Sequence, residues 1–130
     1  MKYEPIDPET ERIATQVLDA AFDVHRELGP GLLEETYEDC FAYELTDRGI
    51  RYERQRFLPV KYKEVKVDTR LRFDLLIANC IVVEIKAVEK VHPVHEAQLM
   101  TYMKLSSCRL GFLLNFNVVL LKDGISRRII

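Results

Sequence analysis

A short apolar segment that carries two charges limits the folds open to this chain. Residues 81–83 are branched aliphatics, a run that is typical of a strand inside a sheet. Glu84 and Lys86 follow at once, and because side chains alternate along a strand, both lie on one face. A charge in a sheet interior needs a partner. The segment therefore predicts either a partner for these two charges or a site that uses them.

Helical spacing of apolar residues predicts two helices before the first strand. The first begins at Asp7-Pro8-Glu9, which combines a capping carboxylate, a proline in the first turn and an acid near the positive end of the helix dipole. Gly29-Pro30-Gly31 ends this helix. A second helix is expected over about residues 32–48, and its apolar stripe is Leu33, Tyr37, Phe41 and Leu45.

The pattern then changes to the alternation of strands. We expect strands over residues 51–62, 65–77 and 80–87, with turns near Lys63-Glu64 and at Ala78-Asn79. In the second of these strands, six apolar residues are expected on one face: Val65, Val67, Leu71, Phe73, Leu75 and Ile77.

The rest of the chain predicts a crossover. A third helix runs from Pro93 to about Leu105, and strands follow at residues 110–116 and 118–121, the latter continuing after Asp123-Gly124. The order is therefore α-α-β-β-β-α-β-β. An antiparallel meander followed by a helical crossover predicts an α/β (α+β) fold with a mixed sheet flanked by helices. A length of 130 residues suits a single domain over residues 1–130.

The net charge of −2 conceals a strong asymmetry along the chain. Residues 1–47 hold 13 acids and 3 bases, whereas residues 48–72 hold 9 bases and 3 acids. A basic segment within an acidic chain hints at a polyanionic partner. Solvated strand faces are the alternative explanation of the same pattern.

The cysteines and the hydropathy exclude several classes of protein. Cys40, Cys80 and Cys108 are far apart, so neither a cysteine-built zinc or iron–sulfur site nor a disulfide framework is expected. They are interpreted as small buried hydrophobes in a reducing compartment. The first residues lack the apolar run of a signal peptide, and no stretch approaches the ~20 apolar residues of a membrane span. We therefore expect a cytoplasmic protein with no membrane partner.

The turn before residue 80 predicts that Asp74 pairs beside Glu84. Two carboxylates this close repel unless a cation lies between them, and hard oxygen ligands with room for waters suit Mg²⁺ or Mn²⁺. Lys86 would orient a water molecule or stabilise developing negative charge. Together these groups would promote the attack of a water molecule on a phosphodiester. A cross-strand salt bridge among the same three residues is the alternative.

The second helix adds another candidate. Glu34 stands one turn before Tyr37, so it is expected to border the apolar stripe, whereas Glu35, Glu38 and Asp39 are expected on the solvent face. A carboxylate at the rim of a core needs a metal or a basic partner. The alternative is that Glu34 only stabilises the start of its helix.

The third helix carries polar residues on one face. Gln98 and Tyr102 are four residues apart, and an amide and a phenol so placed can hold a phosphate or a base. Ordinary surface polarity is the alternative. His92 and His95 bracket Pro93, but no third soft ligand is near, so a metal pair is not expected there.

Several separated motifs then occur in a familiar order. "GLLEETY" at residues 31–37 fits G-x-x-E-x-x-Y; "HRELGPG" precedes it, and "FDLLI", "VVEIKAVEKVHPVHEAQLMTYMK" and "GFLLNF" follow. Together they resemble the GxxExxY family of small bacterial and archaeal proteins over about residues 12–117. That family is similar to the PD-(D/E)XK nuclease superfamily, with its restriction-endonuclease-like core of a mixed sheet between helices. The resemblance therefore implies this fold and a nuclease activity.

The resemblance implies a role for each matching residue. Asp74 matches the motif aspartate, and Glu84 and Lys86 match the E-x-K. Glu34 matches the helical glutamate that often completes the metal site, and the backbone carbonyl of Ile85 would be a further metal ligand. The implied cofactor is Mg²⁺ or Mn²⁺.

Other residues are expected to contact nucleic acid. Gln98 and Tyr102 match the Q-x-x-x-Y helix of the RecB-like branch, where these residues contact DNA near the site. Four arginines are further candidates for phosphate contacts: Arg54, Arg56, Arg70 and Arg72.

Three hypotheses follow. The first is a Mg²⁺-dependent nuclease acting on nucleic acid, with DNA expected. The second is a module with a nuclease-like core that binds nucleic acid or a protein without cutting. The third is a structural subunit, in which Glu34 would point away from Asp74 and Glu84. The small size of the chain favours a homodimer.

Overall fold

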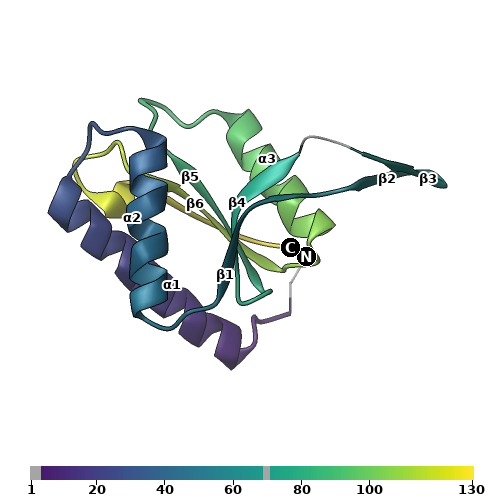
Figure 1. Cartoon of the computed structure of the whole chain (residues 1–130), viewed down its shortest axis with the longest axis horizontal. Helices are drawn as coiled ribbons and strands as arrows, with labels where there is room; N and C mark the ends of the chain where they lie inside the picture. Colours follow the sequence, from purple (N-terminus) through teal and green to yellow (C-terminus); the bar gives the residue numbers. More distant parts are fainter. Residues whose placement is uncertain (1–3, 69–70) are drawn as a thin grey trace.

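The structure is a computed structural model that describes residues 4–68 and 71–130. A five-stranded sheet in the order β1-β4-β5-β6-β7 forms its centre, with helices packed on the sheet (Figure 1). The elements in chain order are α1 (Pro8–Leu28), α2 (Glu34–Asp47), β1 (Tyr52–Phe57), β2 (Val60–Tyr62), β3 (Val65–Val67), β4 (Arg72–Ile77), β5 (Ile81–Lys86), α3 (Pro93–Leu105), β6 (Leu110–Asn115), η1 (Leu121–Gly124) and β7 (Ile125–Ile129).

The first helix starts and stops where the sequence predicts. The Asp7 carboxylate accepts hydrogen bonds from the backbone N–H and the hydroxyl of Thr10, at 3.0 and 2.8 Å. At the other end Gly29 has a φ of 67°, a left-handed conformation that glycine adopts without strain, and its N–H donates to the carbonyl of His25.

The sheet is mixed, as predicted. β4 and β5 pair antiparallel across a tight turn in which Ala78 and Asn79 both have positive φ, as short hairpin turns require. α3 then carries the chain over the sheet, so that β6 lies parallel to β5. α1 and α2 cover one face of the sheet and α3 covers the other.

Two predicted strands are each split in the structure. Residues 51–62 form β1 and β2, separated at Pro59, which has no N–H to donate to a sheet. Residues 65–77 form β3 and β4. β2 and β3 pair only with each other, and this hairpin extends away from the main sheet (Figure 1).

The predicted alternation within residues 65–77 is wrong in two respects. Val65 and Val67 are exposed, because they belong to the projecting hairpin. Leu75 packs with the core under α1 and α2, whereas Phe73 packs with the core under α3. The strict period therefore breaks at Asp74, opposite a distortion of β1 at Gln55, whose φ is 52°.

The strand predicted at residues 118–121 is also wrong. This apolar run forms a turn that leads into η1, and the last strand begins only at Ile125. Val119 and Leu120 are exposed to solvent, and the Val118 carbonyl accepts a hydrogen bond from His25 Nε2 at 2.8 Å. A backbone carbonyl of this segment therefore binds the side chain of His25, whereas the carbonyls of a strand would bind the backbone of a neighbouring strand.

The cysteines are free thiols, with Cys108 buried and the other two half-buried. Across the part of the chain that the structure describes, no helix is long and apolar enough to cross a membrane.

Candidate active site

The backbone ladder between β4 and β5 ends one residue before two carboxylates. Leu75 and Val83 are the last pair in register. At the next position the Asp74 N–H donates to Glu84 Oε2 at 2.7 Å, and the Ile85 N–H donates to Asp74 Oδ2 at 2.8 Å. Side-chain carboxylates thus take the place of backbone acceptors and are held against each other.

Burial dominates the electrostatics of this pair. Glu84 is only 5% exposed, and burial followed by the charge of Asp74 raises the pKa of Glu84 to about 9. Burial also raises the pKa of Asp74, although the hydrogen bond from the Ile85 N–H opposes that rise. Two adjacent carboxyl groups with raised pKa values retain a proton at neutral pH.

Lys86 supplies the positive charge of the site. It follows Glu84 on the same side of β5 and is half-buried. Its ammonium group lowers the pKa of Asp74, of Glu84 and of Glu34, in each case against the larger effect of burial. The ammonium group therefore lies within electrostatic range of all three acids.

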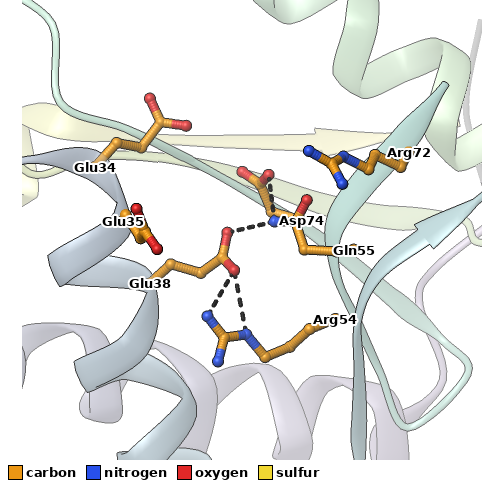
Figure 2. A pocket seen from close by; sticks show the side chains of 7 residues that line it. All are labelled: Glu34, Glu35, Glu38, Arg54, Gln55, Arg72 and Asp74. Carbon is orange, nitrogen blue, oxygen red and sulfur yellow. Dashed lines mark hydrogen bonds and ion pairs between the residues drawn. The ribbon is translucent and has the colours of Figure 1, made fainter. Parts of the chain in front are cut away.

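Glu34 is the first residue of α2 and lies at the rim of a cavity of about 560 Å³. Figure 2 shows residues of α2, β1 and β4 around this space: Glu34, Glu35, Glu38, Arg54, Gln55, Arg72 and Asp74. The side chain of Glu34 is exposed overall, yet partial burial of its carboxyl group raises its pKa. Glu34 and Asp74 thus line the same cavity.

Glu38 corrects the sequence interpretation, which placed it on the solvent face. It is only 6% exposed, and its Oε1 accepts a hydrogen bond from Gln55 Nε2 at 2.8 Å. The same nitrogen donates to Asp74 Oδ1 at 3.3 Å, so Gln55 joins the two carboxylates (Figure 2). Glu38 lies one helical turn after Glu34 and so shares its side of α2, but the sequence does not show that residues of β1 cover it.

Tyr37 fixes the start of α2. Its side chain is fully buried and its ring stacks on Phe116 at a centroid distance of 4.8 Å. Its hydroxyl donates to the carbonyl of Gly29 and accepts from the N–H of Leu32. The final tyrosine of G-x-x-E-x-x-Y thus holds the loop that precedes Glu34.

The residues predicted on α3 differ in their surroundings. Tyr102 is 7% exposed, and burial raises its pKa, with further increases from the charges of Glu84 and Asp74. Gln98 lies one turn earlier and is exposed to solvent. The structure therefore brings Tyr102 near the carboxylate pair and leaves Gln98 at the surface of the helix.

Two of the predicted arginines have acidic partners. Arg54 donates to Glu38 from Nε and Nη2, at 3.1 and 2.8 Å, and also pairs with Asp39. Arg56 pairs with Glu53 at 3.2 Å on the exposed side of β1. Arg54 therefore fixes Glu38 in place.

Arg72 packs against an aromatic ring beside the cavity. It lines the cavity with Asp74, and its guanidinium lies over the ring of Phe57 at 5.7 Å from the centroid. Arg70 lies outside the described residues.

The donor set fits a hard divalent cation. Among the described residues, no group of three or more His, Cys, Asp or Glu side chains is arranged to hold a metal ion. Asp74 and Glu84 nevertheless form a close carboxylate pair, and the carbonyl of Ile85 leaves β5 on the same side as the N–H that binds Asp74. Mg²⁺ often binds one or two carboxylates and keeps several waters, so two carboxylates and a carbonyl suit it.

Comparison with known proteins decides the family. A family model described as the PD-(D/E)XK nuclease superfamily matches residues 11–128, almost the whole chain. The chain belongs to the PD-(D/E)XK nuclease superfamily. No curated protein and no solved structure matches it. Membership supports a nuclease-like function in general, with a nucleic-acid substrate and the divalent metal that PD-(D/E)XK nucleases generally use.

The buried carboxyl group gives a prediction for the pH dependence of stability. Glu84 ionises near pH 4.5 in the unfolded PD-(D/E)XK chain but only near pH 9 in the folded one, so its contribution to stability is lost as pH rises through this range. Glu84→Gln removes the ionisation. The free energy of unfolding of the wild type should therefore fall more steeply with pH, by about 1.4 kcal/mol per pH unit, than that of the variant.

Urea denaturation at pH 5, 7 and 9 measures this difference. Glu89→Gln, at an exposed position a few residues along the chain, is the control and should follow the wild type. Parallel pH profiles for wild type and Glu84→Gln would show that the folded protein does not raise the pKa of Glu84.

A second prediction concerns the loop before α2. Tyr37→Phe leaves the Gly29 carbonyl and the Leu32 N–H without their partner, so we expect a loss of about 1–3 kcal/mol in the free energy of unfolding. Tyr43→Phe, on the exposed side of α2, is the matched control and should lose little. Equal stability of the two variants, measured by thermal or urea denaturation, would exclude the anchoring role of the Tyr37 hydroxyl.

Proposed function

We propose that this PD-(D/E)XK chain is a Mg²⁺- or Mn²⁺-dependent nuclease of the GxxExxY type that hydrolyses phosphodiester bonds, with DNA as the expected substrate. The observation that supports this most is the buried pair of Asp74 and Glu84 with Lys86 beside it. A salt bridge alone would not require two carboxyl groups to be buried against each other, since each raises the free energy of ionising the other.

Asp74, Glu84 and the carbonyl of Ile85 would hold the divalent cation. Glu34, which lines the same cavity from α2, is proposed as a third carboxylate on the resemblance, since the three side chains are not already grouped as an ion would require. A bound cation would supply the positive charge that stabilises charge developing on the phosphate. The proton that the pair retains at neutral pH would be released on binding, because carboxylate ligands must be ionised.

Other side chains would orient the reacting groups. The ammonium group of Lys86 would hold the attacking water and stabilise negative charge at the phosphate. Glu38 and Gln55 would act as positioning residues, since their hydrogen bonds reach Asp74 from α2 and β1. Tyr102 would meet the strand from α3.

Further contacts to the substrate are proposed at the edge of the cavity. Arg72 lines the cavity and would contact a phosphate. Gln98 is a proposed substrate contact because it matches the Q-x-x-x-Y helix of the RecB-like branch that the chain resembles. Arg54, Arg56 and Arg70 are proposed phosphate contacts because they belong to the basic segment 48–72. We also propose that residues 1–130 act as one nuclease domain in the cytoplasm and pair as a homodimer.

Substitution of the central residues tests the proposed chemistry. Asp74→Asn and Lys86→Ala should each lower the rate of Mg²⁺- or Mn²⁺-dependent cleavage by at least about 100-fold. Neither should lower the melting temperature substantially, because Asn keeps an acceptor for the Ile85 N–H and Lys86 is only half-buried. Cleavage is measured on labelled single-stranded, double-stranded and branched DNA and on RNA.

Matched controls are available in the same chain. Asp19→Asn and Lys104→Ala change the same residue types at exposed positions of α1 and α3 and should cut at the wild-type rate. Full activity in both Asp74→Asn and Lys86→Ala would reject the assignment. Nucleic-acid binding with no response to Mg²⁺ or Mn²⁺ in calorimetry would favour the binding module instead.

A further inference from the structure

The hairpin of β2 and β3 has no role in the proposed chemistry, and the described residues of the chain leave most of it exposed to solvent. We call residues 60–67 the arm. Its two strands pair only with each other, and it projects from the body of the molecule (Figure 1). A two-stranded hairpin standing free in water is marginally stable, so an arm of this kind gains from a partner.

The register of the arm places like charges opposite each other. Lys61 pairs with Lys66, and strand alternation puts both on one face. Like charges at directly opposed positions destabilise a hairpin unless an anion lies near them. Lys63 adds a third positive charge at the turn. Glu64 is the one acid in residues 60–67, and its Oε2 lies 4.0 Å from Lys61 Nζ.

The opposite face of the arm is apolar and exposed. Val60 pairs with Val67 and Tyr62 pairs with Val65, and Tyr62 is 62% exposed. The ammonium group of Lys63 lies 5.5 Å from the centroid of the Tyr62 ring. The tip therefore combines positive charge with an aromatic surface, a combination that suits nucleic acid.

The arm is continuous with the strands of the site. The chain enters it after Phe57 at the end of β1 and returns from it into β4, where Arg72 and Asp74 line the cavity. Five residues of extended chain from Phe57 to Tyr62 span about 17 Å, or about five base pairs of duplex. A strand whose phosphodiester lies at Asp74 would thus have the arm alongside it.

One side of the cavity is acidic, which disfavours the approach of a polyanion from that side. The cavity is lined on the α2 side by Glu34, Glu35 and Glu38, and residues 1–47 hold 13 acids and only 3 bases. A polyanion approaching that side is repelled. The lysine face of the arm supplies complementary charge on the segment that links β1 to β4, the two strands that contribute residues to the cavity.

We propose that the arm grips the phosphate backbone of the nucleic-acid substrate through Lys61, Lys63 and Lys66. The choice of nucleic acid as partner rests on the proposed function, whereas the lysine register and the projection of the arm are independent of it.

Binding of a fluorescein-labelled 20-base-pair duplex and of the same-length single strand tests this proposal. Anisotropy is measured in EDTA, so that binding is read without cleavage, over a series of salt concentrations. Lys61→Gln/Lys66→Gln should weaken binding and reduce the slope of log affinity against log salt by about 2 for the duplex. Lys104→Gln/Lys122→Gln makes the same change of charge at exposed positions elsewhere and should leave the slope unchanged.

Two further measurements keep the outcomes distinct. Lys63→Glu at the turn reverses a charge without touching the paired positions and should weaken binding further than neutralisation does. A wild-type salt slope in both arm variants overturns the proposal, and so does a change in oligomeric state by sedimentation with unchanged binding, which would assign the apolar face to a second copy. If binding depends on the arm lysines but no metal-dependent cleavage occurs, the role of the arm stands and the proposed nuclease activity is rejected. If cleavage occurs but binding does not depend on the arm lysines, the nuclease activity stands and the role of the arm is rejected.

Discussion

The site depends on one exchange of hydrogen bonds. Where the β4–β5 ladder stops, the carboxylate of Glu84 accepts from the backbone of Asp74, and the carboxylate of Asp74 accepts from the backbone of Ile85. Each acid satisfies a backbone donor that the ended ladder would have left without an acceptor. The two acids are thereby fixed side by side in a buried position, although their charges repel.

The surrounding residues moderate that repulsion. Lys86 brings a positive charge from the same strand, and Gln55 joins Asp74 to Glu38 across a distorted β1. Burial still raises the pKa of both carboxyl groups against these contacts, so the pair retains a proton at neutral pH. The chain belongs to the PD-(D/E)XK nuclease superfamily, whose nucleases generally use divalent metals.

Local sequence patterns predicted the helices, the mixed sheet and the contact between Asp74 and Glu84. Helix caps, the spacing of apolar residues and the turn at residues 78–79 each depend only on residues that are close together in the sequence. The same patterns gave wrong predictions where the structure of a segment depends on residues far away in the sequence. Glu38 is buried because Arg54 and Gln55 reach it from β1, which helical spacing alone does not show. The run at residues 118–121 looks like a strand but has no strand beside it.

The proposed nuclease activity requires that Asp74 and Glu84 together bind a divalent cation. A crystal of the protein soaked in Mn²⁺ and measured at the manganese absorption edge tests it most directly, since anomalous density locates the ion without reference to activity. We expect a peak between the carboxylates of Asp74 and Glu84, within reach of the carbonyl of Ile85. A well-diffracting soaked crystal with no peak there, or with manganese bound only at other surfaces, would contradict it.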